Sequence, residues 1–295
     1  MVSSVAVIMT VHNRKAKTLR CLDSLHRVWT EGGKRVGLSC FITDDGCTDG
    51  TSKAVLSRNY EFPVHLILAD GTLFWCGGMI KAWNAALCHG RFDGYLWLND
   101  DTEILPGLIN DIVEADEFCL GKYGRSGIYV GSTKDADTGN LSYGGFNYVN
   151  KWTLLDQFVI PDGKSFQPCE AAHGNITYVS SGVVEKLGIF YPGYHHGGAD
   201  HDYTYLAHKA GFPVLVLPHF SGICDNDHPK DGGRANFFAL PVKERVKQLN
   251  LHNTLLFNRR CFPLRLPIVL ISGYSKVLFP KFCYRVYLMA RGVKL

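Results

Sequence analysis

Residues 5–11 read VAVIMTV, an apolar run without a polar break, and this stretch decides the fold. Such a run is typical of a central strand in a parallel sheet, because that strand is buried on both faces and its side chains need not alternate. Apolar residues at roughly helical spacing follow between residues 19 and 28. A buried strand that leads into a helix favours an α/β protein.

The alternation of strands and helices continues through the first two-thirds of the chain. We expect strands at 38–43, 64–69, 95–98 and 214–217, helices at 51–58, 78–88 and 203–210, a strand that enters a helix at 179–189, and short strands with glycine turns at 126–146. This order predicts a mixed, mainly parallel sheet flanked by helices. In such sheets ligands bind in the crevice outside the carboxyl ends of the strands.

The end of the chain has a different composition. We expect one domain at 1–235 and a small helical appendage at 236–295, which is basic and apolar. The most apolar part, residues 262–282, is interrupted by prolines and carries Arg265 and Lys276, so we do not expect it to cross a membrane. Two interpretations stay open: contact with an anionic membrane surface, or a packed helical pair with a solvated basic face.

Composition and charge limit the remaining function classes. The net charge of +4 is mild, and we expect no nucleic-acid partner. The ten cysteines form no C-x-x-C pair, so we expect reduced thiols and a cytoplasmic protein. Residues 1–11 lack a basic leader and a small-residue cleavage site, and are expected to form a strand rather than a signal peptide.

Two acidic clusters follow expected strands. Residues 44–51 read DDGCTDGT, which suits a turn and a helix cap, but Asp44 or Asp45 could also bind the N–H of a pyrimidine base or a ribose hydroxyl. Residues 99–103 read NDDTE. A cluster of this kind can hold Mg²⁺ or Mn²⁺, which prefer oxygen ligands, although a solvated loop is the alternative.

Two further segments contain residues that could act on a ligand. Residues 73–81 read LFWCGGMIK, where Gly77 and Gly78 precede the expected helix and could aim backbone N–H groups at phosphate; for Trp75 we favour a core position over a stacking wall. Residues 197–203 read GGADHDY. There Asp200 either caps a helix or takes a proton from an attacking hydroxyl. Five histidines are candidate metal ligands: His195, His196, His201, His219 and His228.

In this order, the segments resemble the family 2 glycosyltransferases with a GT-A, Rossmann-like fold. Residues 10–14 read TVHNR and are similar to the family's first strand and loop. Residues 44–50 are similar to its nucleoside-binding turn. Residues 99–101 are similar to its metal-binding D-x-D, and residues 199–202 to its E-D-x-D base motif. Residues 74–79 resemble the rhamnosyltransferase-like and galactofuranosyltransferase-like branches. The resemblance covers about three-quarters of the chain.

The resemblance implies an inverting, metal-dependent transfer of a hexosyl group from a UDP- or dTDP-linked sugar. Asp200 would be the base, and Asp101 would hold Mg²⁺ or Mn²⁺. The family's metal-binding His has no clear counterpart in this sequence; His228, preferred over His219, is a candidate metal ligand only because both follow the expected strand 214–217. The expected nucleotide-sugar contacts are Thr10, His12, Arg14, Asp44, Asp45, Trp75, Gly77, Gly78, Lys81, Asn99 and Asp100. The acceptor would be a glycan or a lipid-linked glycan, as in surface polysaccharide synthesis. We therefore expect Asp45, Asp101 and Asp200 to converge on one cleft.

The sequence also departs from the family pattern. Asn99 replaces the first acidic residue of D-x-D, and Ala199 stands where many relatives have Glu. A sugar nucleotidyltransferase is an alternative, but residues 12–15 lack the glycines of its phosphate loop. A catalytically inactive nucleotide- or carbohydrate-binding module is the alternative from another class.

Overall fold

The computed structural model describes residues 2–195, 197–225, 237–238 and 240–290. The chain forms two compact units, Met1–Asn226 and Asp227–Leu295. The boundary expected after residue 235 lies outside the described residues and stays a prediction. Each unit is described separately below.

The first unit is built on a ten-stranded sheet in which eight strands follow the order β10-β13-β6-β12-β4-β1-β2-β3. Its parallel half consists of β1 (Ser4–Val11), β2 (Gly37–Asp45), β3 (Val64–Ala69) and β4 (Gly94–Leu98). In the other half, β12 (Ile176–Ser180) runs antiparallel to both β4 and β6, while β6 (Ile128–Lys134) and β13 (Val214–Ile223) are parallel. The expected mixed, mainly parallel sheet is confirmed.

Short strands complete the first unit. β10 (Gln167–Pro168) and β5 (Glu103–Ile104) pair with β13, and β7 (Leu141–Tyr143) pairs with β6. A separate three-stranded sheet contains β8 (Gly145–Asn150), β9 (Leu155–Phe158) and β11 (Ala171–Ala172). Short strands with glycine turns were expected from residue 126 to 146, but the sequence analysis did not separate the second sheet from the first.

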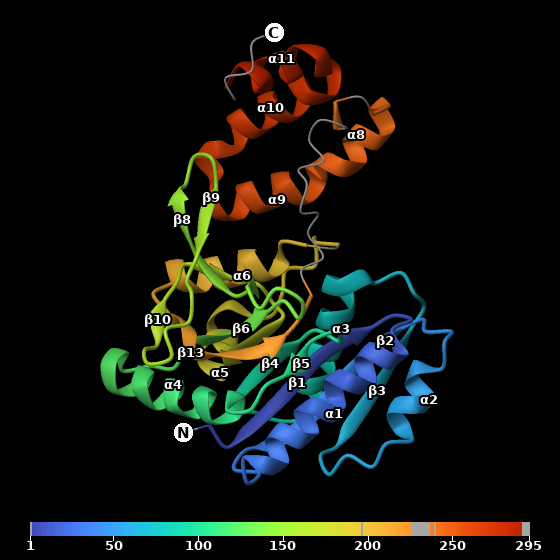
Figure 1. Ribbon diagram of the computed structural model, residues 1–295, viewed down its shortest axis with the longest axis vertical. Helices are drawn as coiled ribbons and strands as arrows, with labels where there is room; N and C mark the ends of the chain where they lie inside the picture. Colours follow the sequence, from blue (N-terminus) through green and yellow to red (C-terminus); the bar gives the residue numbers. More distant parts are fainter. Residues whose placement is uncertain (1, 196, 226–236, 239, 291–295) are drawn as a thin grey trace. The chain divides into compact units, whose positions relative to one another are not determined.

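Helices cover both faces of the main sheet (Figure 1). The helices of the first unit are α1 (Lys15–Glu31), α2 (Thr51–Leu56), α3 (Phe74–His89), α4 (Leu108–Tyr123), α5 (Ser181–Leu187) and α6 (Ala199–Lys209). Apolar residues of α1 and α4 share one core with the odd-numbered residues of β1, such as Val7 and Met9. On the opposite face Trp83 of α3 packs edge-on against Trp97 of β4, with ring centroids 5.4 Å apart. Burial on both faces explains the unbroken apolar run of β1.

Several helix boundaries differ from those expected. α3 begins at Phe74 rather than at residue 78, so Gly77 and Gly78 lie inside the helix and not before it. α6 begins at Ala199 rather than at residue 203, which places Asp200 in its first turn. Helix α4 was missed, although Leu108, Ile112, Ala115 and Cys119 recur at helical spacing on its buried face.

The second unit consists of helices, as its composition predicted. It contains α8 (Val242–Leu249), α9 (Leu251–Cys261), a short 3₁₀ helix η1 (Pro263–Arg265), α10 (Leu266–Leu278) and α11 (Pro280–Ala290). The ten cysteines of the chain all lie within the described ranges and carry free thiols.

Gly78 gives a test of how α3 packs on the sheet. A Cβ at Gly78 would lie 2.1 Å from Thr10 Oγ1 and 2.7 Å from Thr10 Cβ, while the Gly78 carbonyl accepts a 2.8 Å bond from Thr43 Oγ1. We expect Gly78→Ala to lower the free energy of unfolding by about 1–3 kcal/mol, because the helix must move away from β1. Gly77→Ala is the matched control, since the three atoms nearest to its Cβ all belong to the Leu73 side chain, at 3.1 Å and beyond. Equal urea midpoints for the two variants would contradict this packing.

Candidate functional site

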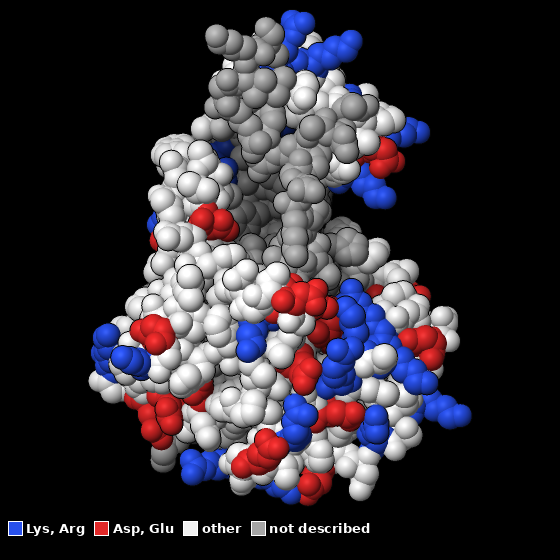
Figure 2. Space-filling view, viewed as in Figure 1, with Lys and Arg blue, Asp and Glu red and all other residues white. Residues whose placement is uncertain are grey.

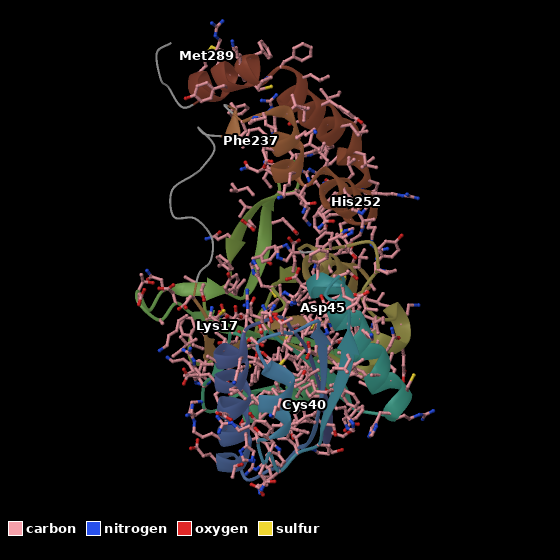
Figure 3. All side chains as sticks on the ribbon, turned by 90° about the vertical axis from the view of Figure 1, so that its right-hand side faces the viewer. Lys17, Cys40, Asp45, Phe237, His252 and Met289 are labelled. Carbon is pink, nitrogen blue, oxygen red and sulfur yellow. The ribbon has the colours of Figure 1, made fainter. Side chains whose placement is uncertain are left out.

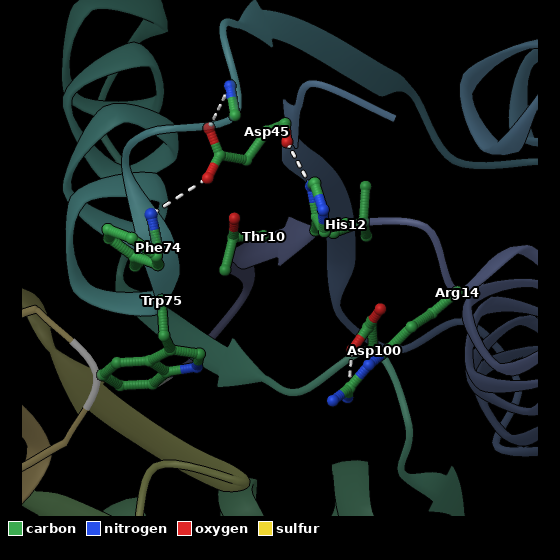
Figure 4. Close-up of a pocket in the computed structure, with 9 residues that line it drawn as sticks. Thr10, His12, Arg14, Asp45, Phe74, Trp75 and Asp100 are labelled. Carbon is green, nitrogen blue, oxygen red and sulfur yellow. Dashed lines mark hydrogen bonds and ion pairs between the residues drawn. The ribbon is translucent and has the colours of Figure 1, made fainter. Parts of the chain in front are cut away.

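A pocket lies at the carboxyl ends of β1, β2 and β4 (Figure 4). It has a volume of about 280 Å³. Its lining residues are Thr10, Val11, His12, Arg14, Asp45, Gly71, Phe74, Trp75 and Asp100. The strand-end rule for open α/β sheets predicts a ligand crevice in this place. Six of the residues expected to contact the nucleotide sugar therefore share one pocket.

Asp45 shapes the pocket through its carboxylate, which binds backbone N–H groups. The residue is 3% exposed. It accepts hydrogen bonds from the N–H groups of Gly71 at 3.0 Å, Leu73 at 3.1 Å and Phe74 at 2.9 Å; Figure 4 shows the bond from Phe74. These N–H groups precede or open α3, where the helix has no carbonyl partners for them. Asp45 thus fixes the start of α3, which explains why the helix begins earlier than its apolar pattern indicated.

Asp44 and Gly46 stabilise the neighbouring turn. The Asp44 carboxylate accepts hydrogen bonds from the Cys47 N–H at 2.6 Å and from the Ser52 hydroxyl. Gly46 has a positive φ of 72°, and a Cβ there would lie 2.8 Å from the Gly71 nitrogen. The turns after β2 and β3 therefore touch, and only glycine fits between them. Both carboxylates have protein partners in this structure, so their contact with a nucleoside stays a prediction.

Gly71 was missed by the sequence analysis. It lies in the turn after β3, has a φ of 89°, and lines the pocket beside Asp45. The signal was present as an Asp-Gly pair directly after an expected strand, which is typical of a tight turn at a sheet edge.

Arg14 carries the positive charge of the pocket. Its guanidinium donates to Asp101 Oδ2 at 2.8 Å and to Asp100 Oδ1 at 3.4 Å (Figure 4 shows the Asp100 contact). Burial, together with the neighbouring Asp101, raises the pKa of Asp100 to about 6. Arg14 and a 3.2 Å hydrogen bond from Thr18 Oγ1 act in the opposite direction. Two carboxylates side by side repel each other, so this part of the site favours a cation.

The same carboxylates fit a hard divalent cation. Carboxylate oxygens are preferred ligands of Mg²⁺ and Mn²⁺, which are often held by one or two carboxylates together with substrate phosphate and water. Among the described residues, no group of three or more His, Cys, Asp or Glu side chains gathers to hold a metal. A cation at Asp100 and Asp101 would therefore need oxygen atoms from a ligand to complete its coordination.

Within the described residues, neither of the two histidines preferred as metal ligands is seen beside Asp100 and Asp101. His228 lies outside the described residues. His219 lies on β13, and its Nδ1 is 3.1 Å from Asp111 Oδ2 of α4. Its imidazole therefore has a carboxylate partner of its own, and the metal roles of both histidines stay predictions.

Trp75 forms a wall of the pocket, which differs from the core position that we favoured. Its Nε1–H donates to Asn99 Oδ1 at 2.8 Å, and its ring lies against Phe190 at a centroid distance of 5.4 Å. The residue that replaces the first acid of D-x-D thus orients the indole by accepting its hydrogen bond. An Asp at this position could also accept that bond, but it would add a third carboxylate to the cluster.

Asp200 lies beside this wall, in the first turn of α6. Its Oδ2 accepts from the Gly174 N–H at 2.9 Å and its Oδ1 from the His201 N–H at 3.0 Å. A Cβ on Gly174 would lie 3.0 Å from the Trp75 ring and 3.2 Å from Asp200 Cβ, so both side chains lie close to Gly174. Asp200 therefore adjoins the wall of the pocket that Asp45 and Asp100 line.

Two histidines accompany Asp200. His201 Nε2 lies 4.0 Å from Asp200 Oδ2, and the His173 and His201 rings meet edge to face at 4.7 Å. Burial of Asp200 opposes its ionisation, but His201, His173 and the two backbone N–H groups outweigh burial and lower its pKa. His173 was missed by the sequence analysis, because it is 27 residues away from Asp200 and no motif contains it.

Three other expected contacts lie outside the lining of the pocket. Gly77 and Gly78 lie within α3, where Gly78 packs against Thr10 of β1. The Lys81 ammonium donates to the Leu68 carbonyl at 2.6 Å, at the end of β3. Their contact with a nucleotide sugar stays a prediction.

The role of Asp45 gives a test that requires no ligand. We expect Asp45→Ala to lower the free energy of unfolding by at least about 2 kcal/mol, since it leaves buried backbone N–H groups without their acceptor. Asp70→Ala is the matched control, because this carboxylate lies in the neighbouring turn after β3, is exposed, and accepts hydrogen bonds from Thr72. Urea unfolding measures both, and equal losses for the two variants would refute the special role of Asp45.

Comparison with known proteins agrees with this geometry. Residues 6–147 match the family model described as Glycosyl transferase family 2. None of the curated proteins compared with the sequence matches it. The branch that residues 74–79 suggested stays a prediction.

Solved structures share the fold. Mannosyltransferase PcManGT from Pyrobaculum calidifontis, in complex with GDP-Man and Mn²⁺, has a TM-score of 0.56 at 17% identity, over 99% of this chain and 76% of that chain. S. aureus TarS 1–349 in complex with UDP has a TM-score of 0.58 at 12% identity, over 93% of this chain and 88% of that chain. The structure of the same protein with UDP-GlcNAc has a TM-score of 0.56 at 13% identity, over 99% of this chain and 76% of that chain.

At these identities the solved structures establish the fold, while the family match rests on the sequence itself. The matched residues include β1, β2, β4 and the pocket that they form. Residues 6–147 of this chain thus match the family 2 glycosyl transferase model, and the chain has the GT-A fold of the solved structures; both findings agree with the resemblance found in its motifs.

Proposed function

We propose that this protein is an inverting glycosyltransferase that moves a hexosyl group from a UDP- or dTDP-linked sugar to an acceptor hydroxyl. One observation carries the proposal: Asp45, Arg14 and Asp100 line a pocket whose Trp75 wall adjoins Asp200. One end of this arrangement suits a diphosphate and the other end suits proton removal. The family match supports the same reaction class.

In the proposed reaction, the diphosphate lies near Arg14, whose guanidinium can bind its oxygens. Asp100 and Asp101 would hold Mg²⁺ or Mn²⁺, which when bound neutralises the charge that develops on the leaving diphosphate. Arg14 would then exchange part of its contact with the two carboxylates for contact with the phosphate oxygens. This exchange keeps the positive and negative charges of the pocket balanced.

At the other end, Asp200 accepts the proton of the acceptor hydroxyl while the acceptor oxygen attacks the anomeric carbon. The bond from that carbon to the diphosphate oxygen breaks as the new bond forms on the opposite face, so one displacement inverts the configuration. The lowered pKa of Asp200 keeps it ionised at neutral pH and ready for this role. The Trp75 ring, held by Asn99, would position the sugar between the two ends.

We propose a glycan or a lipid-linked glycan as the acceptor, in the synthesis of a surface polysaccharide, and a cytoplasmic location at the inner face of the membrane. The composition of the C-terminal helices supports this location, because they are rich in basic and apolar residues. The two alternatives, an inactive binding module and a sugar nucleotidyltransferase, predict no transfer to an acceptor.

Asp200→Asn tests the proposed function. The unchanged chain is first screened with UDP- and dTDP-sugars and Mn²⁺ or Mg²⁺, and a donor that binds should raise its melting temperature. We expect Asp200→Asn to keep this shift but to lower turnover, measured as release of nucleoside diphosphate, by about 10²-fold or more. Asp156→Asn, an exposed carboxylate on β9, is the control and should retain turnover.

Two results would count against the proposal. Full turnover in Asp200→Asn would remove the assigned base. If the unchanged chain consumed no sugar nucleotide with metal and a range of acceptors, while one of them still raised its melting temperature, the binding module would be favoured instead.

His201→Gln tests the environment of the base. A protonated imidazole 4.0 Å from Asp200 favours the ionised carboxylate, so its removal should raise the pKa of Asp200. We expect the acidic limb of the pH profile of kcat/KM to move to higher pH. His208→Gln, on the exposed side of the same helix, should leave the limb in place. A limb that stays unchanged or moves to lower pH in His201→Gln would contradict the assignment.

A further inference from the structure

The C-terminal unit differs sharply in charge from the rest of the chain. From Arg245 to Leu295 the sequence contains ten Lys and Arg residues and no Asp or Glu. The preceding 244 residues contain 21 basic and 27 acidic residues, so their net charge is −6 while that of the last 51 residues is +10. Figure 2 shows Lys and Arg side chains over the C-terminal helices. Such segregation attracts an anionic partner to this part of the chain.

Helix α10 exposes apolar residues where a helix of an isolated soluble protein would expose polar ones. Leu264, Ile268, Ile271, Tyr274 and Leu278 follow at intervals of three or four residues from η1 to the end of α10, and each is at least 50% exposed. The only charged residues between 263 and 279 are Arg265 and Lys276, and both are partly buried. These residues form one continuous apolar stripe.

The opposite side of α10 is the one that packs within the unit. Gly273 and Val277 are buried there. A Cβ on Gly273 would lie 2.7 Å from Leu251 Cδ2 of α9, and Arg245 of α8 donates to the Val277 carbonyl at 3.0 Å. The packing of α10 on α8 and α9 therefore fixes which side faces outward, and the apolar stripe is not used within this unit.

Helix α11 continues the apolar surface and adds charge to it. Phe282, Val286 and Met289 are exposed by 66%, 44% and 58%, and their spacing of four and three residues places them on one face. Met289 is labelled in Figure 3. Lys281 and Arg285, both exposed, lie along one side of this face. An apolar face flanked by basic residues is typical of a helix that lies in a membrane interface.

The lengths of the two helices favour lying on a bilayer over crossing it. Among the described residues, no single helix is long and apolar enough to span a membrane; Pro263–Leu278 and Pro280–Val286 reach that length and composition only when taken together, and they are bent by 114°. At about 1.5 Å per residue, the 13 residues of α10 reach about 20 Å, which is less than the hydrocarbon thickness of about 30 Å.

We propose that the exposed faces of α10 and α11 form a docking surface for an anionic lipid bilayer. The apolar stripe would enter the boundary between headgroups and acyl chains, and Lys281 and Arg285 would contact acidic headgroups. A second copy of this chain fits less well, because a symmetric contact would bring two segments of charge +10 together. The inference deepens the proposed function by giving the protein a route to a lipid-linked acceptor, but docking itself requires no catalysis.

Vesicle flotation of the full chain tests the surface. We expect the chain to float with phosphatidylcholine vesicles that contain phosphatidylglycerol, to float far less with phosphatidylcholine alone, and to be released by salt. Ile271→Asp with Phe282→Asp should reduce the bound fraction at least about tenfold, because each change removes a large apolar side chain from the bilayer. Leu56→Asp is the matched control, since Leu56 is 63% exposed on α2 and lies in the other unit.

Three outcomes would overturn the proposal. The first is that the unchanged chain does not float, and the second is that the double variant floats as well as the unchanged chain. The third is a dimer in solution that the double variant converts to monomer without any vesicle binding, which would assign the surface to a second copy. Circular dichroism and an unchanged melting temperature check that the double variant is folded.

Turnover with a water-soluble acceptor separates this proposal from the proposed function. The double variant should retain that turnover, because its substitutions lie outside the pocket. A chain that floats but transfers no sugar would count against the enzyme and leave the docking surface intact.

Discussion

The site depends on the contact between the Asp45 carboxylate and the backbone N–H groups that open α3. This contact joins the end of β2 to the start of the helix and so determines where Trp75 stands. Trp75 in turn binds Asn99 at the end of β4 and touches Gly174, whose N–H binds Asp200. Through these steps, one buried carboxylate positions groups from four separate parts of the chain.

Charge balance is the second constraint. Asp100 is 6% exposed and lies beside Asp101, and burial alone would favour its neutral form. Arg14 compensates part of this cost, but its side chain is about half exposed and its hold on the two carboxylates is correspondingly weak. Asp100 and Asp101 lie beside one accessible cation, Arg14, and this arrangement is suited to an exchange of partners. A diphosphate that entered with its metal would bring positive charge to the two carboxylates and negative charge to Arg14.

The parts of this site that the sequence predicted are those that depend on local pattern. The strand 5–11 and the acidic residues after residues 43 and 98 follow from apolar runs that end in polar clusters, and parallel pairing brings such ends to one edge. The start of α3 could not be predicted in this way, because it is set by a carboxylate 28 residues earlier in the chain. The packing role of Gly78 likewise depends on Thr10. The histidine pair beside Asp200 combines His173, from the loop between β11 and β12, with His201 of α6. Helix α4 is different, since its pattern was visible and was overlooked.

The two units distribute their charge in different ways. The first unit has a net charge of −6, so in the proposed reaction the attraction for a nucleotide diphosphate would come from Arg14 and a bound metal rather than from the unit as a whole. Recognition by a few placed charges at short range is selective, because each contact has a defined geometry. From Arg245 onward the chain has many dispersed basic residues and no acidic ones, which suits a surface whose charges are themselves dispersed and mobile. The proposed donor and the proposed membrane would therefore place different demands on charge, and the two distributions of charge lie in separate units.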